Sequence, residues 1–241
     1  MKAYPLPQDD MEDIGSIPNI DVSLQYNSNA NFMGRNAYCG LGQDKNLNLK
    51  NAYLEKGCAK MLRAAAASLQ GKFKLKILDA FRPNTVQAAM RRWAQTESTD
   101  PKIRANPSKF IGSPYDVAKL PKRNDPTNLD EPPQKVSMHL RGLAVDVTLV
   151  PGGDGDSPSG VRSNGEVNMG TAFDDFTSCA TTKPDPGCEI TPGQFEAREK
   201  LRAAMTKGGL KPYENEWWHF ECGDKNSLKS IGNHPVPETP N

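Results

Sequence analysis

Two short stretches of the sequence combine histidine with carboxylates in a pattern that suits a metal ion. The stretch SMHLRGLAVD carries His139 and Asp146, and the stretch ENEWWHFE carries Glu216 and His219. Two imidazoles and one carboxylate, with a fourth position left to water, are typical ligands of catalytic zinc. Zinc lowers the pKa of bound water towards about 7. Hydrolysis also needs a base that takes the proton from this water, and Glu216 is the candidate.

The spacing of His139 and Asp146 requires a bend between them. In an unbroken strand two residues seven positions apart point to opposite faces of a sheet. Gly142 allows a bulge or bend that would bring both side chains to one side. Each histidine taken singly also fits a structural role, but a carboxylate inside an apolar strand needs a cation nearby. For Asp146 this cation is either zinc or Arg141.

A third stretch places an arginine just beyond a predicted strand. Residues 72–77 alternate between apolar and polar types, which predicts a strand with one solvent-facing side, and Asp79-Ala80-Phe81-Arg82-Pro83 follows. A guanidinium held near a scissile carbonyl can stabilise the oxyanion by about 3 kcal/mol. Arg82 is a candidate for this role, and a salt bridge to Asp79 is the structural alternative.

The elements that must position these residues are predicted by hydrophobic spacing. Apolar residues at helical intervals predict a helix over about 51–70, and strands are expected at 143–150 and about 217–221. A second helix is expected after a cap at Asn84, and the residues of its inner face are Val86, Ala89, Met90 and Trp93. We therefore expect an α+β fold, a small mainly antiparallel sheet flanked by helices, with the metal at the open face of the sheet.

One further helix has a clear start and a clear end. Thr191 can cap it, Pro192 occupies the first helical position and Gln194 the third, which is the pattern of a capping box. Gly208 and Gly209 then end the helix. The sequence therefore predicts a helix over about 192–207, directly before the aromatic strand.

Length and composition bound the organisation of the chain. It has 241 residues, of which 36% are hydrophobic and 24% charged, with 20 Gly and 20 Pro. This composition favours a single domain over 1–241 with long loops. The expected core spans about 20–225, the loop excursions are at about 100–135 and 176–188, and a loose tail covers 226–241.

Charge and cysteine content narrow the partners and the compartment. The net charge is +1 without a basic stripe, so we expect no nucleic-acid partner, and the absence of a long apolar run predicts no membrane span. Cys179 and Cys188 bracket a polar loop, where a disulfide and two free thiols are equally reasonable. The five cysteines are Cys39, Cys58, Cys179, Cys188 and Cys222. This number favours the bacterial periplasm over the cytoplasm.

These stretches together resemble the VanX-like D-alanyl-D-alanine dipeptidases, which are related to D-Ala-D-Ala carboxypeptidases and more distantly to hedgehog domains. Residues 137–146 satisfy the family pattern SxHxxGxAxD, and residues 216–219 are similar to its EWWH. The DAFRP turn, the MGTAFD segment at 169–174 and Tyr26 with NFMG at 31–34 are similar to further family segments.

The resemblance implies a complete set of site residues. The implied ligands of one zinc ion per chain are His139, Asp146 and His219. The implied catalytic residues are Glu216, as general base and acid, and Arg82, which stabilises the tetrahedral intermediate. The implied substrate residues are Asp174, which holds the free ammonium group, and Ser137 and Tyr26, which line the pocket.

The expected activity is hydrolysis of D-Ala-D-Ala to two D-alanines. One alternative is a cell-wall D,D-carboxypeptidase or endopeptidase of the same superfamily, which acts on longer peptides. Another is a zinc-stabilised binding protein without catalysis, although such a protein has no need for both Glu216 and Arg82. Serine hydrolysis by Ser137 is a remote alternative, because the sequence around it has no G-x-S-x-G elbow.

Overall fold

The computed structural model describes residues 11–21, 52–82, 84–96, 98, 101–106, 137–153, 157 and 159–222. Several features singled out in the sequence lie outside these ranges. They are Tyr26, the NFMG segment at 31–34, Cys39, most of the 100–135 excursion and the tail at 226–241.

A five-stranded sheet forms the centre of the fold, with strand order β2-β4-β5-β7-β6. Its strands are β2 (Ile20–Asp21), β4 (Phe73–Asp79), β5 (Ala144–Pro151), β6 (Leu210–Pro212) and β7 (His219–Cys222). The β2–β4 pairing is parallel, and the other three pairings are antiparallel. The prediction of a mainly antiparallel sheet is therefore confirmed. A separate antiparallel pair joins β1 (Met11–Asp13) to β3 (Tyr53–Glu55).

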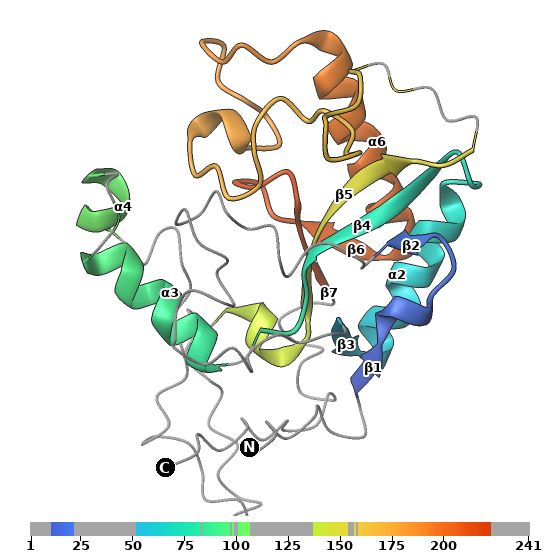
Figure 1. Ribbon diagram of the computed structural model, residues 1–241, viewed down its shortest axis with the longest axis horizontal. Helices are drawn as coiled ribbons and strands as arrows, with labels where there is room; N and C mark the ends of the chain where they lie inside the picture. The colour runs from blue at the N-terminus through green and yellow to red at the C-terminus, as the bar shows by residue number, and fades with distance from the viewer. Residues whose placement is uncertain are drawn as a thin grey trace, which may run out of the picture.

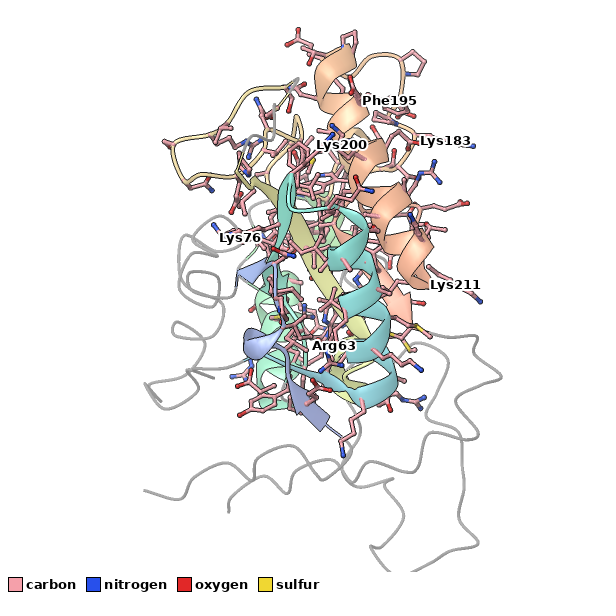
Figure 2. The ribbon with its side chains drawn as sticks, turned by 90° about the vertical axis from the view of Figure 1, so that its right-hand side faces the viewer. Arg63, Lys76, Lys183, Phe195, Lys200 and Lys211 are labelled. Atoms are coloured by element: carbon pink, nitrogen blue, oxygen red, sulfur yellow. A yellow bond between two sulfur atoms is a disulfide. The ribbon has the colours of Figure 1, made fainter. Side chains whose placement is uncertain are left out.

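Helices lie on both sides of this sheet. The helices α2 (Lys56–Ser68) and α6 (Pro192–Gly208) run side by side on one side, as Figures 1 and 2 show. The helices α3 (Asn84–Thr96) and α4 (Pro101–Ala105) lie on the other side in Figure 1. Short 3-10 turns occur at Ile14–Ser16, Met138–Arg141 and Ser178–Ala180. The fold is α+β, as expected.

Packing between α2 and α6 depends on a glycine. A Cβ on Gly208 would lie 2.5 Å from the carbonyl oxygen of Met61 and 2.8 Å from the Cβ of Ala65, so the two helices approach more closely than a larger residue allows. The predicted capping box at Thr191 and Gln194 is present at the start of α6. Gly209, with φ of 100°, ends the helix, as the sequence predicted.

The predicted bounds of two helices were partly wrong. The first helix begins at Lys56 instead of about 51, because Tyr53–Glu55 pairs with β1 as a strand and the side chain of Glu55 accepts a hydrogen bond from the backbone of Cys58. Asn84 is the first residue of α3 instead of its cap. Met90 is buried as expected, and the side chains of the other three residues of that inner face lie outside the described part.

Two predictions about strands also need correction. Lys76 was expected to face solvent, but its side chain is 3% exposed, and its Nζ lies 2.9 Å from Oε1 of Glu166. An ion pair thus accompanies the buried amine, as burial of a charge requires. The aromatic strand begins at His219, because Trp217 and Trp218 belong to the turn before it.

Two disulfides cross-link the described chain. Cys179 forms a disulfide with Cys188, so the alternative of two free thiols at these positions is wrong. Cys58 of α2 pairs with Cys222 of β7, across 164 residues of sequence, a pairing that the sequence did not indicate. Within the described residues, no helix combines the length and the apolar character that crossing a membrane requires.

Candidate active site

Three side chains predicted as metal ligands converge at one end of the sheet. Asp146 of β5 lies opposite His219 of β7, and His139 comes from the 3-10 turn before β5. Nε2 of His139 is 3.3 Å from Oδ1 of Asp146 and 3.2 Å from Nδ1 of His219. Nδ1 of His219 is 2.9 Å from the same Asp146 oxygen. The three ligand atoms thus form a compact triangle.

Gly142 supplies the predicted bend. It ends the turn Met138–Arg141 with φ of 67°, a left-handed conformation that favours glycine. Its backbone N–H donates to the carbonyl of His139, 3.1 Å away, and the next residue, Leu143, donates to the carbonyl of Met138. The chain therefore reverses tightly between His139 and the start of β5, which brings His139 and Asp146 to the same site.

The backbone around Ala80 orients His139. Nδ1 of His139 lies 2.7 Å from the carbonyl oxygen of Ala80 and donates to it, so Nε2 carries the lone pair that faces the site. The N–H of Arg82 donates in turn to the carbonyl of His139, 3.0 Å away. The bond from Nδ1 of His139 to Ala80 is typical of histidines that bind metals, because it fixes the tautomer of the ring.

His219 faces the site through Nδ1 and faces a second carboxylate through Nε2. Oε1 of Glu221 lies 3.5 Å from Nε2 of His219. The ring of Tyr213 packs edge-on against the imidazole, with 5.6 Å between the ring centroids. Sequence reasoning did not single out Glu221 or Tyr213. Glu221 had a signal, since it lies two residues after His219 in the same strand and its side chain therefore lies on the same face.

The arrangement of the ligand atoms fits zinc. Tetrahedral zinc with bonds of about 2.0–2.1 Å separates its ligand atoms by about 3.3–3.4 Å. The observed separations among His139, Asp146 and His219 are 2.9, 3.2 and 3.3 Å. His139 and Asp146 are each 2% exposed, and a buried carboxylate between two imidazoles is a donor set that favours a divalent cation.

The electrostatics of these side chains point the same way. Burial alone would raise the pKa of Asp146, but the nearby imidazoles of His139 and His219 outweigh it and hold that pKa below its usual range. Burial alone would lower the pKa of His219, but hydrogen bonds to Asp146 and Glu221 raise it well above its usual value. The cluster thus attracts positive charge strongly.

Glu216 lies beside the metal ligands. Its Oε2 is 3.9 Å from Nδ1 of His219, and its side chain is 16% exposed. Burial raises the pKa of Glu216 to about 7, and the charge of Asp146 adds to this effect, while His219 and Arg82 oppose it. A carboxyl group whose pKa is close to neutral can both accept and return a proton near neutral pH.

Arg82 makes the predicted salt bridge with Asp79 and also approaches the metal ligands. Its Nε donates to Oδ2 of Asp79, 2.7 Å away, its Nη2 contacts the same oxygen, and its Nη1 donates to Oε1 of Gln87 at 2.7 Å. Nη2 also lies 3.9 Å from Oδ2 of Asp146. Arg82 therefore lies beside Asp146, and its guanidinium is held by Asp79 and Gln87.

Asp174 has an unusual backbone and an unusual carboxyl group. Its φ of 59° lies in the left-handed region, which few residues other than glycine adopt. Burial raises its pKa well above the usual value, and the charges of Asp146, Glu216 and Asp79 raise it further, while Arg82 lowers it. Asp174 is thus within electrostatic range of both the ligands and the base.

Ser137 and Tyr26 are the other two residues predicted to line the pocket. Ser137 immediately precedes the turn that carries His139, and its side chain does not cap that turn. Tyr26 lies outside the described residues.

The chain was compared with protein families and with solved structures. The model of the M15 peptidases, described as D-ala-D-ala dipeptidase, matches residues 10–237. Two solved structures are similar to this chain at 12% identity and a TM-score of 0.39, over 76% of this chain. One is a mutant of the vancomycin-resistance D,D-pentapeptidase VanY from a VanB-type cassette in complex with Zn(II), covered over 80% of its length. The other is VanYB in complex with D-alanine-D-alanine, covered over 78%.

No curated protein matches the chain. The family match, however, covers nearly the whole sequence, and the M15 peptidases depend on zinc, for which the structure provides a site at His139, Asp146 and His219. The chain therefore belongs to the M15 family of D-Ala-D-Ala dipeptidases and is a zinc metallopeptidase of the kind that acts on D-Ala-D-Ala.

Proposed function

We propose that this protein is a D-alanyl-D-alanine dipeptidase, which hydrolyses free D-Ala-D-Ala to two D-alanines. The observation that supports this most is the partly buried carboxyl group of Asp174, whose pKa responds to the charges of Asp146 and Glu216 at the metal site. A carboxylate there suits the free ammonium group of a dipeptide, which a longer peptide lacks at that place. Burial and three neighbouring acidic residues raise the pKa of Asp174, so a cationic group is needed to stabilise its charged form.

Glu216 is the proposed general base and acid. Zinc, when held by His139, Asp146 and His219, polarises the scissile carbonyl and acidifies a water molecule. Glu216 takes a proton from water at the start of the reaction and returns it to the leaving amine. A pKa of about 7 suits both steps, because the base must be partly ionised and its conjugate acid must give up the proton readily.

Arg82 is the proposed donor to the developing oxyanion. Its guanidinium is already held by Asp79 and Gln87, so little reorganisation is required when charge develops on the substrate. The position of Nη2, 3.9 Å from Oδ2 of Asp146, supports this role because it sets the guanidinium next to the metal ligands. Ser137 and Tyr26 remain proposed pocket residues.

We also infer the organisation and the compartment. The family match over residues 10–237 supports a single peptidase domain over 1–241. Two disulfides are typical of proteins from an oxidising compartment, which favours the bacterial periplasm.

The test is D-alanine release from D-Ala-D-Ala by the zinc-loaded protein, run beside N-acetyl-D-Ala-D-Ala and a chelator-treated sample. We expect chelator-sensitive cleavage of the free dipeptide and very little cleavage of the acetylated one. Efficient cleavage of the acetylated substrate would instead assign the protein to the D,D-carboxypeptidases. If neither is cleaved, a non-catalytic zinc-stabilised protein becomes the better account.

A further inference from the structure

Asp174 lies on a loop that has little regular structure of its own. Between β5 and α6, the described residues contain one isolated bridge, between Val161 and Val167, and the short turn Ser178–Ala180. The left-handed backbone of Asp174 is also less favourable than a right-handed one, although Asp and Asn adopt it more readily than other residues with a side chain. The place of its carboxyl group must therefore depend on tertiary contacts made by the rest of the loop.

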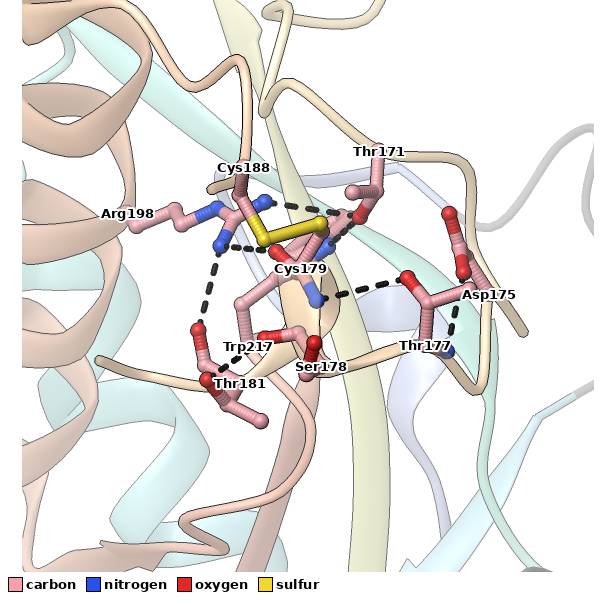
Figure 3. Close-up of a disulfide and its surroundings, with 9 residues drawn as sticks. All are labelled: Thr171, Asp175, Thr177, Ser178, Cys179, Thr181, Cys188, Arg198 and Trp217. Carbon is pink, nitrogen blue, oxygen red and sulfur yellow. Dashed lines mark hydrogen bonds between the residues drawn. A yellow bond between two sulfur atoms is a disulfide. The ribbon is translucent and has the colours of Figure 1, made fainter. Parts of the chain in front are cut away.

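Four hydrogen bonds to the loop come from Arg198 of α6. Before Asp174 along the chain, Nε of Arg198 donates to the carbonyl of Met169 at 2.7 Å, and Nη2 donates to Oγ1 of Thr171 at 3.4 Å. After Asp174, Nη1 donates to the carbonyls of Cys179, at 2.8 Å, and Thr181, at 3.1 Å. One side chain thus joins both ends of the loop, as Figure 3 shows for Thr171, Cys179 and Thr181.

The same loop ends contact the segment that carries the proposed base. Nε1 of Trp217 donates to Oγ1 of Thr171 at 2.9 Å, so this hydroxyl is shared between Trp217 and Arg198. The backbone N–H of Trp217 donates to the carbonyl of Ala180, 2.9 Å away. The ring of Phe173 packs edge-on against Trp218. Trp217 and Trp218 link Glu216 to His219 in sequence, so the loop and the catalytic segment are held to each other.

We propose that Arg198 is a positioning residue that clamps both ends of the 169–181 loop and thereby sets Asp174 at the distance from the metal site that selects substrates with a free ammonium group. This inference rests on the proposed dipeptidase function. Arg198 itself takes no part in the chemistry, because Nε, Nη1 and Nη2 of its guanidinium all donate hydrogen bonds to the loop.

The chemistry of arginine suits this role. Arg198 is 3% exposed, and a guanidinium can donate several hydrogen bonds in one plane to carbonyls on separate segments. Burial lowers the pKa of Arg198 to about 10, so the group stays charged near neutral pH. Lysine, with a compact ammonium group, cannot reproduce this planar set of donors.

The disulfide supports the clamp from one side. Cys179, whose carbonyl accepts from Arg198, is bonded to Cys188, just before α6, the helix that carries Arg198. Figure 3 shows the disulfide beside the guanidinium. Opening the disulfide should loosen only the end of the loop that follows Asp174, whereas replacing Arg198 should loosen both ends.

The experiment compares Arg198→Gln with Arg202→Gln in the zinc-loaded full chain. Arg202 lies one turn further along α6, its side chain is 43% exposed, and it pairs with Glu199 instead of the loop. For each variant we would measure zinc content, kcat and KM for D-Ala-D-Ala, and the ratio of kcat/KM between the free and the N-acetylated dipeptide. Arg198→Lys and the pair Cys179→Ser with Cys188→Ser serve as milder variants if Arg198→Gln folds poorly.

Arg198→Gln should keep its zinc, raise KM for D-Ala-D-Ala by at least about tenfold and lower the free-to-acetylated ratio by a similar factor, since small displacements of a substrate-binding group have effects of this size. The milder variants should shift both values in the same direction by less, and Arg202→Gln should match the parent. The positioning role of Arg198 is wrong if Arg198→Gln, or both milder variants, lose only thermal stability and keep the parent's KM and free-to-acetylated ratio of kcat/KM. A parent protein without D-alanine release would overturn the proposed function itself.

Discussion

Acidic side chains are concentrated at the site. Asp79, Asp146, Asp174 and Glu216 lie within electrostatic range of one another, and Arg82 lies among them. Burial of these groups raises the pKa values of Asp174 and Glu216. Further cations would therefore favour the ionised forms of Asp174 and Glu216, and zinc and the ammonium group of a substrate are two cations that the proposed reaction supplies.

Glu216→Gln tests the base at this scale. Glutamine keeps the shape but cannot accept the proton, so kcat for D-Ala-D-Ala should fall by about 10²–10⁴-fold while zinc remains bound. Steady-state kinetics and metal analysis measure the two quantities. Glu214→Gln, at an exposed position on the same segment, should behave like the parent. Unchanged turnover in a zinc-replete Glu216→Gln protein would refute the assignment.

Asp174→Asn should separate stability from activity. Because the folded pKa of Asp174 is raised above its ordinary 3.8, its proton stabilises the folded state fully below that pH, and this stability is lost as pH rises through the folded pKa. Asparagine cannot ionise, so the variant does not lose stability in this way as pH rises. Asparagine also tolerates a left-handed backbone. The melting temperature of the variant relative to the parent should therefore increase from about pH 4 towards neutral pH.

The same variant should lose activity. Without the ion pair to the substrate ammonium, kcat/KM for free D-Ala-D-Ala should fall by about 10–100-fold, the range for losing a hydrogen bond to a charged group. Parallel melting curves for the two proteins at every pH would show that Asp174 does not carry the buried charge, and unchanged kcat/KM would remove its role in binding.

At the scale of secondary structure, one row of residues across three strands builds the site. Asp79 of β4 pairs with Asp146 of β5, and Asp146 pairs with His219 of β7. A register shift between Ile77 and Asp79 precedes this row on β4. The turn at Gly142 then adds His139 from outside the sheet.

Gly142→Ala tests the turn. A left-handed backbone costs a residue with a Cβ about 1–2 kcal/mol, so the variant should lose that much stability, and its zinc affinity should fall because His139 is displaced. Gly165 is the matched control, since its φ is 81° and a Cβ added there would meet open space. Gly165→Ala should lose similar stability by urea denaturation, yet bind zinc as the parent does in a chelator competition. Equal zinc affinities for both variants would contradict this view of the turn.

The sequence predicted the elements whose signals are local. The capping box at Thr191, the bend at Gly142 and the apolar strand after it depend on neighbouring residues, and all are present. Burial of Lys76 was missed because its partner, Glu166, is distant in sequence. The clamp by Arg198 was missed for the same reason, since its acceptors are mainly backbone carbonyls, which leave no pattern in the sequence.

At the scale of the whole molecule, disulfides join parts that are distant in sequence. Cys58 and Cys222 connect α2 to the strand that carries His219, and both cysteines are buried. Cys58 is buried on the inner face of α2, but nothing in the sequence identified Cys222 as its partner.

Removing this cross-link should weaken the whole fold. Because the Cys58–Cys222 disulfide closes a loop with a sequence separation of 164, chain entropy predicts a loss of up to about 5 kcal/mol in the pair Cys58→Ala with Cys222→Ala. The Cys179–Cys188 disulfide closes a sequence separation of only 9. The pair Cys179→Ser with Cys188→Ser should therefore lose about 2–3 kcal/mol of folding stability. Urea unfolding of the three proteins measures both values. A larger loss from the shorter loop would contradict this ranking.

The most direct measurement of the central claim is D-alanine release from D-Ala-D-Ala while zinc is added stepwise to the metal-free protein. A single site at His139, Asp146 and His219 predicts that activity is absent without zinc, rises in proportion to added metal and stops rising at one equivalent per chain. Release of D-alanine by the metal-free protein in the presence of a chelator, or no release at one equivalent of bound zinc, would contradict the assignment as a zinc-dependent D-Ala-D-Ala dipeptidase.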